Sequence, residues 1–382
     1  MSAVYIVADN IISPLGETTA ENFLQLGKNM SGIQLQVRAS MNKEPFFASL
    51  FPTSQFDKWK NEQEVLSNFT RFEILLIRSI QGALQNSGVT ISSPETMVII
   101  SSTKGNIELL EQDANDPDII ERISLHHSAK KIATFFKLAH TPVVISNACI
   151  SGLAALLTAK RMLEQGIYKN AVVVAADLIT KFVYSGFQSF QAISKTPCRP
   201  FDIARDGISL GEAAGTIILS VHQNTHSDLR INGGAISNDA NHISGPSRTG
   251  EELCIAISKS LKQSNLTIKD IGFISAHGTA TVYNDEMEAK AFSLAGMESL
   301  PVNSIKGYYG HTLGAAGVIE SVIALQSLKE QIVIPTLGFN DLGVSRPVNI
   351  SNRPQNVSTN YCLKTASGFG GCNAALVFSR HN

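Results

Sequence analysis

The stretch VVISNACISG, Val143–Gly152, decides the fold class of this chain. It opens with a β-branched apolar run, which is typical of a strand buried on both faces. Small residues follow, and then Gly152–Gln165, an alanine- and leucine-rich segment with helical periodicity. A strand that turns tightly into a helix predicts an α/β unit, with the Cys149 thiol at the turn.

Similar apolar runs occur along the rest of the chain. Together with Val143–Ser146, they predict strands at Val4–Val7, Met97–Ser101, Ala171–Ala175, Thr216–Val221, Gly272–Ser275 and Ala374–Ser379. Besides Gly152–Gln165, helical patterns occur at Phe72–Ser87 and Leu313–Lys329. Strands that alternate with helices indicate a layered α/β fold.

Two segments of the chain show the same order of predicted elements, an internal echo. Pro142–Leu157 reads as a strand, a small-residue turn with Cys149, and a helix. Pro301–Leu328 reads as a short strand, a glycine-rich turn with His311, and a second helix. The echo predicts a duplicated architecture with halves 1–223 and 224–382. The polar segment Asn224–Asp228 fits the connection between them.

Composition excludes several classes of protein. The 382 residues are 43% hydrophobic and 16% charged, which suits a large buried core. The net charge of −1 argues against a nucleic-acid partner or a polybasic membrane anchor. No apolar run approaches eighteen residues, so we expect no membrane insertion, and the first residues do not resemble a signal peptide.

The number and spacing of the cysteines argue against structural disulfides and metal-bound thiolates. There are five, an odd number with irregular spacing and no CxxC pair, so we expect neither a disulfide framework nor a metal site. Free thiols indicate a reducing compartment. The five are Cys149, Cys198, Cys254, Cys362 and Cys372.

Cys149 is the strongest candidate nucleophile. The partial positive charge and free N–H groups at a helix N-terminus favour the thiolate. The small residues around Cys149 leave room for a substrate. The alternative, a buried structural cysteine, stays open on position alone.

Two histidines lie in segments that suggest function. His277 follows an apolar strand and precedes Gly278 and two threonines, and sites in α/β folds are usually built at such strand ends. His311 lies in a run rich in glycine and alanine, where the backbone must pass close to a ligand or another helix. A half-buried histidine without a chemical role is the alternative for each. Lys306 precedes His311 by five residues in a setting that is not polar.

Taken in order, these segments resemble the elongating β-ketoacyl-[acyl-carrier-protein] synthases of the thiolase superfamily, from about Val4 to Phe378. Five motifs in the right order carry the resemblance, including SGFGGCN at residues 367–373. It implies an α/β, thiolase-like duplicated five-layer αβαβα fold, usually found as a dimer.

The resemblance also implies roles for individual residues. The catalytic set would be Cys149, His277, His311 and Lys306, supported by Glu320 and by the gating aromatic Phe369 in the Gly368–Gly371 loop. Thr279 and Thr281 would bind pantetheine. Ser237–Pro246 resembles the family's entrance loop, and Lys130 and Lys131 would dock the acidic carrier protein.

The implied reaction is a decarboxylative Claisen condensation. An acyl chain would pass from acyl carrier protein to the thiol, and malonyl-carrier protein would then lose carbon dioxide and supply the carbanion. No metal or organic cofactor is implied. We expect a cytoplasmic enzyme that works as a homodimer, or as a heterodimer with a chain-length-factor-like subunit.

Some positions depart from the common pattern. Ser367 stands where many relatives carry a second Phe, and Gln191 stands where an Arg for carrier docking is frequent. Ile150 and Ser151 replace the more usual Ala-Thr. These differences leave fatty-acid, polyketide and polyene synthesis open.

Three other interpretations remain. A thiolase would use a second cysteine in a glycine-rich C-terminal loop as its acid/base; Cys372 is the candidate, but it lies two residues after Gly370 in a GFGGCN pattern, and His311 is present. A chain-initiating synthase would carry Cys–His–Asn. A silent chain-length partner typically lacks the nucleophile, whereas Cys149 is present.

Overall fold

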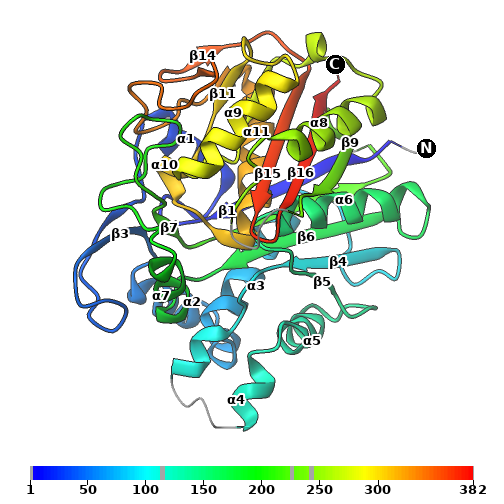
Figure 1. Ribbon diagram of the computed structural model, residues 1–382. Coiled ribbons are helices and arrows are strands. Elements are labelled where there is room, and N and C mark those ends of the chain that lie inside the picture. The colour runs from blue at the N-terminus through cyan, green and yellow to red at the C-terminus, as the bar shows by residue number, and fades with distance from the viewer. Residues whose placement is uncertain (1–2, 112–116, 224–227, 241–244, 382) are drawn as a thin grey trace.

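The computed structural model describes residues 3–111, 117–223, 228–240 and 245–381. Eleven strands in these residues form one mixed sheet in the order β13-β11-β10-β15-β16-β9-β1-β8-β6-β4-β5 (Figure 1). These strands are β1 (Tyr5–Ile12), β4 (Thr96–Ser101), β5 (Val143–Ile145), β6 (Asn170–Asp177), β8 (Ala213–Ser220), β9 (Leu229–Asn238), β10 (Phe273–Ser275), β11 (Pro301–Asn303), β13 (Asn349–Ile350), β15 (Tyr361–Gly368) and β16 (Cys372–Arg380).

The sheet repeats itself. The N-terminal half contributes β1, β4, β5, β6 and β8, and the C-terminal half contributes β9, β10, β11, β15 and β16. If the strands of each half are numbered 1 to 5 in chain order, both halves run across the sheet in the order 3-2-4-5-1, with β13 added at the C-terminal edge. In both sets the first two neighbouring pairs are parallel and the last two are antiparallel. The two half-sheets meet where β1 lies beside β9, at the register pair Tyr5 and Arg230. This repeat supports the predicted duplication. The boundary after residue 223 stays a prediction, because residues 224–227 lie outside the described part of the chain.

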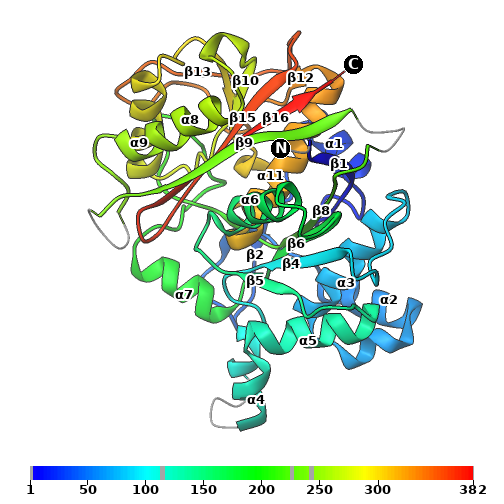
Figure 2. The same ribbon diagram turned by 90° about the vertical axis from the view of Figure 1, so that its right-hand side faces the viewer.

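Helices and half-sheets alternate in five layers, as expected. Helix α3 (Arg71–Leu84) packs on the outer face of the N-terminal half-sheet. Helices α6 (Ser151–Glu164) and α11 (Ala316–Glu330) lie between the two half-sheets (Figure 2). Helices α8 (Glu251–Gln263) and α9 (Val282–Leu294) cover the far side. Each interface between layers is filled by a cluster of buried apolar side chains.

The two central helices touch through glycine. A Cβ added to Gly152 of α6 would lie 2.6 Å from the backbone nitrogen of Val318, and one added to Gly317 of α11 would lie 2.6 Å from that of Leu153. Such separations leave no room for a side chain. The glycines near Cys149 and His311 therefore allow two helices to pass close together, as the sequence indicated.

The remaining elements surround this frame. Other helices are α1 (Thr19–Gly27), α2 (Thr53–Glu62), α4 (Pro117–Arg122), α5 (Leu125–Phe136), α7 (Lys181–Ser189) and α10 (Lys306–Tyr309), with 3₁₀ turns η1 (Glu64–Asn68), η2 (Ile107–Glu111), η3 (Ile268–Asp270) and η4 (Leu313–Ala315). The minor strands are β2 (Gln34–Gln36), β3 (Phe46–Ser49), β7 (Leu210–Gly211), β12 (Ile332–Val333) and β14 (Gln355–Asn356). No helix among the described residues is long and apolar enough to span a membrane.

Every predicted strand overlaps an observed one, but two long strands were missed. Strand β9 alternates buried and half-buried residues and carries two glycines, so its apolar signal is weak. Strand β15 contains Lys364, which interrupts its apolar run although the side chain is buried. The predicted helix Leu313–Lys329 begins instead with the 3₁₀ turn η4, and α11 follows from Ala316.

Candidate active site

Cys149 lies in the tight turn between β5 and α6. The preceding Ala148 has φ +44°, a left-handed conformation that strains any residue with a Cβ. Ser151 braces the turn, because its hydroxyl accepts from the N–H of Asn147 and donates to the carbonyl of Ala148. The turn places Cys149 beside the first residues of α6, where free N–H groups favour an anion.

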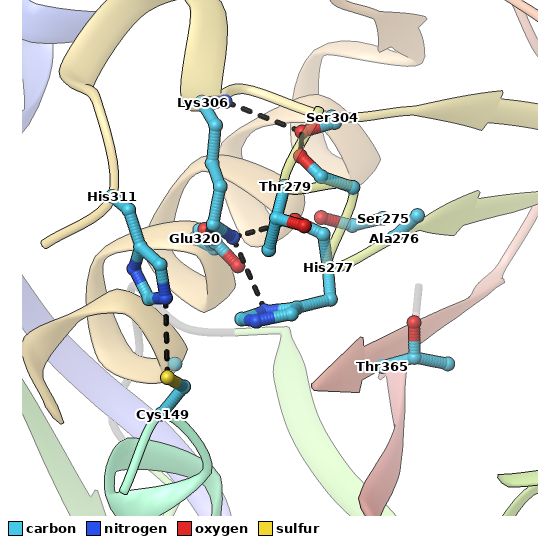
Figure 3. A network of polar contacts seen from close by, with 12 residues as sticks. Cys149, Ser275, Ala276, His277, Thr279, Ser304, Lys306, His311, Glu320 and Thr365 are labelled. Carbon is cyan, nitrogen blue, oxygen red and sulfur yellow. Dashed lines mark hydrogen bonds and ion pairs between the residues drawn. The ribbon is translucent and has the colours of Figure 1, made fainter. Parts of the chain in front are cut away.

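His311 lies between α10 and η4 and faces the thiol. Its Nε2 is 3.1 Å from Cys149 Sγ (Figure 3). Its Nδ1 accepts a hydrogen bond from the N–H of Leu313 at 3.1 Å. Because a backbone N–H can only donate, the neutral ring carries its proton on Nε2. His311 therefore points an N–H at the sulfur.

His277 follows β10 and approaches the same point. Its Nδ1 is 3.1 Å from the Lys306 ammonium, so this ring also holds its proton on Nε2 (Figure 3). The rings of His277 and His311 lie edge to face with centroids 5.2 Å apart. The nearest ligand atoms of Cys149 and the two histidines all lie within 4.8 Å of one another. The structure thus brings the three predicted residues into one cluster.

Burial keeps both histidines neutral. Each is no more than 2% exposed. Burial lowers the pKa of His277 well below its usual range, and the charges of Lys306, His311 and Lys364 lower it further. Burial also lowers the pKa of His311, as does Lys306. At neutral pH the two rings are therefore hydrogen-bond donors rather than cations.

Burial and the groups around Cys149 shift the pKa of its thiol in opposite directions. Burial raises the pKa of Cys149 to about 11, whereas the Lys306 charge and the N–H of Phe369 lower it. The N–H of Phe369 therefore points toward the sulfur. Gly368 lies against the same turn, since a Cβ there would be 2.9 Å from the nitrogen of Cys149. The Gly368–Gly371 loop thus lies against the turn at Cys149, and the N–H groups of Phe369 and Cys149 are the candidates for an oxyanion site.

Lys306 and Glu320 form a buried ion pair behind His277. The ammonium lies 2.5 Å from Glu320 Oε1 and donates to the carbonyl of His277 (Figure 3). Both side chains are almost fully buried. This agrees with the places that the sequence assigned to them.

Two site residues escaped the sequence analysis. Glu288 of α9 accepts hydrogen bonds from the main-chain N–H groups of His277 and Gly278, and so fixes the turn after β10. Lys364 of β15 contacts the second oxygen of Glu320 at 2.7 Å. Neither lies near a histidine in the sequence, so only the strand register and the packing of α9 bring them to the site.

A cavity of about 420 Å³ opens above the cluster. Its lining includes the predicted Cys149, His277, His311, Thr279, Thr281 and Phe369, together with Gln191 and Ser367. The hydroxyl oxygens of Thr279 and Thr281 are 2.9 Å apart, and Thr281 also caps α9 through the N–H of Asn284. Of the predicted entrance loop, Asp239, Gly245 and Pro246 line the cavity, while residues 241–244 lie outside the described part of the chain.

Phe369 stands at the mouth of this cavity. It is 36% exposed and stacks on Phe187 at 5.8 Å, while Phe190 meets it edge-on at 5.5 Å. Phe187 belongs to α7, and Phe190 follows directly after it. The partners of this ring were not predicted from the sequence.

Three further predicted residues lie away from the cluster. Lys130 and Lys131 are on α5 and do not line the cavity. The Lys131 ammonium donates to the carbonyl of Asn68 and lies over the Phe69 ring. Cys372 is half-buried, and its thiol donates to the side chain of Asn147. It is absent from the lining of the cavity, unlike the acid/base cysteine expected of a thiolase.

Comparison with known proteins agrees with this geometry. Residues 1–224 match the family model of the beta-ketoacyl synthase N-terminal domain, and residues 229–340 match that of the C-terminal domain. The chain is 27% identical to the 3-oxoacyl-[acyl-carrier-protein] synthase 2 of Vibrio cholerae, with 99% of each chain covered.

Two solved structures share the fold. One is a beta-ketoacyl synthase from Burkholderia phymatum, with a TM-score of 0.89, 24% identity and full coverage of both chains. The other is the ketosynthase ApeO of Xenorhabdus doucetiae, solved in complex with its chain length factor ApeC. It has a TM-score of 0.87 and 21% identity, and 100% of this chain and 98% of that one are covered. The two family models together match most of the chain, including Cys149, His277 and His311, so this chain belongs to the beta-ketoacyl synthase family.

Proposed function

We propose that this protein joins acyl units by decarboxylative Claisen condensation, with Cys149 as the nucleophile. One observation carries the proposal: His277 and His311 are both neutral by burial and both hold a proton on Nε2 beside a single buried thiol. This arrangement supplies a nucleophile and two donors for a developing enolate in one chamber.

The first half-reaction is acyl transfer. Cys149 gives up its thiol proton as the sulfur attacks the thioester carbonyl of an acyl-carrier protein, and the N–H groups of Cys149 and Phe369 stabilise the oxyanion. The carrier's thiolate leaves and takes up one proton, which balances the proton lost from Cys149, and the acyl group stays on Cys149. Thr279 and Thr281 line the cavity, which supports their proposed role in binding the pantetheine arm.

The second half-reaction is condensation. Malonyl-carrier protein enters, and its C–C bond to the carboxylate breaks with release of carbon dioxide. The electron pair is held as a thioester enolate by the Nε2–H groups of His277 and His311. The enolate carbon attacks the acyl-Cys149 carbonyl, the thiolate is expelled, and 3-oxoacyl-carrier protein leaves. Lys306 and Glu320 hold His277 in the required tautomer.

This reaction requires no cofactor, because decarboxylation itself generates the carbanion. The proposed partner is a phosphopantetheinylated acyl carrier protein, and the name of the Vibrio cholerae relative, which includes acyl-carrier-protein, supports a carrier protein. The proposed location is the cytoplasm. Lys130 and Lys131 are the proposed docking residues; of the two, Lys131 is already engaged with Asn68 and Phe69.

The protein is proposed to act as a homodimer. A heterodimer with a chain-length-factor-like subunit is the second candidate, supported by the complex of ApeO with ApeC. Ser367 and Gln191 line the cavity beside the gate, so they bear on which acyl group is accepted. The pathway, whether fatty-acid, polyketide or polyene synthesis, follows from that specificity.

Acyl loading tests the proposal directly. The protein is mixed with an acyl carrier protein that bears a medium-chain acyl group, and its intact mass is measured. We expect a gain equal to the acyl group, which Cys149→Ala abolishes and Cys372→Ala leaves unchanged. No gain from a panel of acyl donors would contradict the assignment and favour a silent subunit.

The enolate site has a separate test. Cys149→Gln is expected to release carbon dioxide from malonyl-carrier protein without forming a condensation product, because the two histidines remain in place. Absence of carbon dioxide release from this variant would remove the role assigned to His277 and His311.

A further inference from the structure

Lys364 is a fully buried lysine in a central strand. Its ammonium lies 2.7 Å from Glu320 Oε2, and it donates to the carbonyls of Ser275 at 3.2 Å and Ala276 at 3.0 Å. Two carbonyls and a carboxylate are the oxygen donors that would surround a bound cation. An ammonium in the core is costly unless it is paired in this way.

The strand register explains the position. Strands β10 and β15 are parallel, and Lys364 is paired with Ser275 at the last residue of β10. The two carbonyls that receive its hydrogen bonds therefore belong to the residues just before His277. Lys364 anchors the main chain from which that histidine extends.

Lys364 also shares a carboxylate with Lys306. Glu320 Oε1 contacts Lys306, and Oε2 contacts Lys364. Within the described residues, Glu320 Oε2 accepts no hydrogen bond of good geometry, so the ion pair with Lys364 is what offsets the cost of burying this oxygen. Without Lys364, the whole carboxylate charge would attract Lys306 alone, and Lys306 would be drawn from His277 Nδ1.

We infer that Lys364 is a positioning residue for decarboxylation, a cation built into β15 that balances Glu320 and keeps Lys306 on His277. This inference rests on the proposed function. Lys364 does not touch the thiol, and the proposed acyl transfer uses Cys149 and the N–H groups of the oxyanion site. Its removal should therefore separate the two half-reactions.

The test compares these half-reactions. In the Cys149→Gln background, Lys364→Met is expected to slow carbon dioxide release from malonyl-carrier protein by roughly tenfold to a hundredfold, the range seen when a partner that orients a metal-bound histidine is lost. With Cys149 intact, Lys364→Met is expected to accept the acyl group at the wild-type rate. Retained loading also shows that the variant is folded.

Chemical rescue separates a positioning role from a structural one. Lys364→Ala leaves a space that methylammonium can enter, so added methylammonium is expected to restore carbon dioxide release. In Lys364→Met the side chain fills that space, and no rescue is expected. Lys160→Met is the matched control, because Lys160 is also buried and paired with a glutamate, Glu164, but lies on α6 beyond the site.

The outcomes are distinguishable. Wild-type decarboxylation by Lys364→Met, or failure of methylammonium to rescue Lys364→Ala, would overturn this inference and leave the proposed function intact. Should Lys364→Met not fold, Lys364→Gln replaces it, since its amide can donate to the two carbonyls but carries no charge. If the parent chain neither loads an acyl group nor decarboxylates in the Cys149→Gln form, the proposed function itself fails.

Discussion

At the residue scale, the chemistry depends on where two protons lie. Leu313 and Lys306 donate to the Nδ1 atoms of His311 and His277, and each neutral ring must then carry its proton on Nε2. A ring in this tautomer cannot accept the thiol proton at Nε2. The two histidines are therefore suited to hold an enolate oxygen, while the Phe369 N–H offsets part of the rise that burial causes in the pKa of the Cys149 thiol.

The lowered pKa values of the histidines predict how stability depends on pH. Above pH about 6.5, both rings are neutral whether the chain is folded or unfolded. Below pH about 6.5, the two histidines bind protons in the unfolded chain but not in the folded one, so the free energy of unfolding falls as pH falls. Each histidine contributes about 1.4 kcal/mol per pH unit.

Urea unfolding at pH 7.5 and pH 5.5 measures this slope. His311→Gln is expected to lose less stability between the two pH values than the parent protein. His126→Gln, which replaces an exposed histidine on α5, is expected to keep the parental slope. Equal slopes for the parent and His311→Gln would contradict the assignment of a buried neutral ring.

Sequence motifs predicted the residues of the cysteine–histidine cluster, but not the residues that packing brings to the site, such as Lys364. Cys149, His277 and His311 are each flanked by small residues or glycines, which a linear pattern displays. Lys364 was invisible because a lysine in a strand normally indicates a solvent-facing position. Only the pairing of β15 with β10 shows that its ammonium faces buried carbonyls.

At the element scale, the crossing of α6 and α11 fixes the distance between the nucleophile and the second histidine. Gly317→Ala places a methyl group 2.6 Å from the backbone nitrogen of Leu153, where no side chain can move aside. We expect a loss of about 2 kcal/mol in the free energy of unfolding from overpacking. Slower acylation should accompany it, because α6 carries Cys149 at its start.

Denaturant unfolding and acyl loading check this expectation. Gly27→Ala is the control, since nothing lies within 4 Å of a Cβ at this helical glycine. It should instead gain up to about 1 kcal/mol from helix propensity. A Gly317→Ala protein as stable as the parent would mean that the helices are free to separate.

The gate loop is held by the aromatic rings at and beyond the end of α7. Phe190→Ala removes the edge-on contact with Phe369, a contact worth about 0.5–1.5 kcal/mol. Because the N–H of Phe369 is the proposed oxyanion donor, a looser loop should slow acylation by about threefold to tenfold. Decarboxylation in the Cys149→Gln background should change less, because the enolate is held by the histidines.

Single-turnover acyl loading measures the effect. Phe182→Ala is the matched control: it is 55% exposed and also on α7, but its ring has no stacking contact with Phe369 in the described chain. Equal rates for the two variants would show that the gate does not depend on Phe190.

At the scale of the whole molecule, the sequence predicted the repeat of two halves but not the strand pairing that joins them. The echo between residues 142–157 and 301–328 predicted two halves, because each half needs the same strand, turn and helix to build its layer. The two half-sheets join into one sheet where β1 meets β9, at Tyr5 and Arg230. Nothing local in either strand specifies this pairing, since pairing at such a distance follows from packing of the finished halves.

The eleven-stranded sheet has two edge strands, β13 and β5. Strand β5 ends the N-terminal half-sheet, and among the described residues no strand pairs with its outer side. Its Val143 is 41% exposed, whereas natural proteins usually protect such edges by charge, proline or cover. An apolar, unpaired edge that leads directly to Cys149 is the surface on which we expect a second copy to pair.

Size-exclusion chromatography with light scattering decides between the two assemblies. The parent protein is expected to have the mass of two chains, and Val143→Lys to shift toward one, because like charges would face each other across a twofold axis. Ile203→Lys, at a residue that is 70% exposed and outside the sheet, should remain dimeric. A parent protein that stays at the mass of one chain at every concentration would contradict the homodimer. It would mean that β5 awaits a different subunit, and acyl loading by the isolated chain would then be expected to depend on that partner, because the turn that holds Cys149 begins where β5 ends.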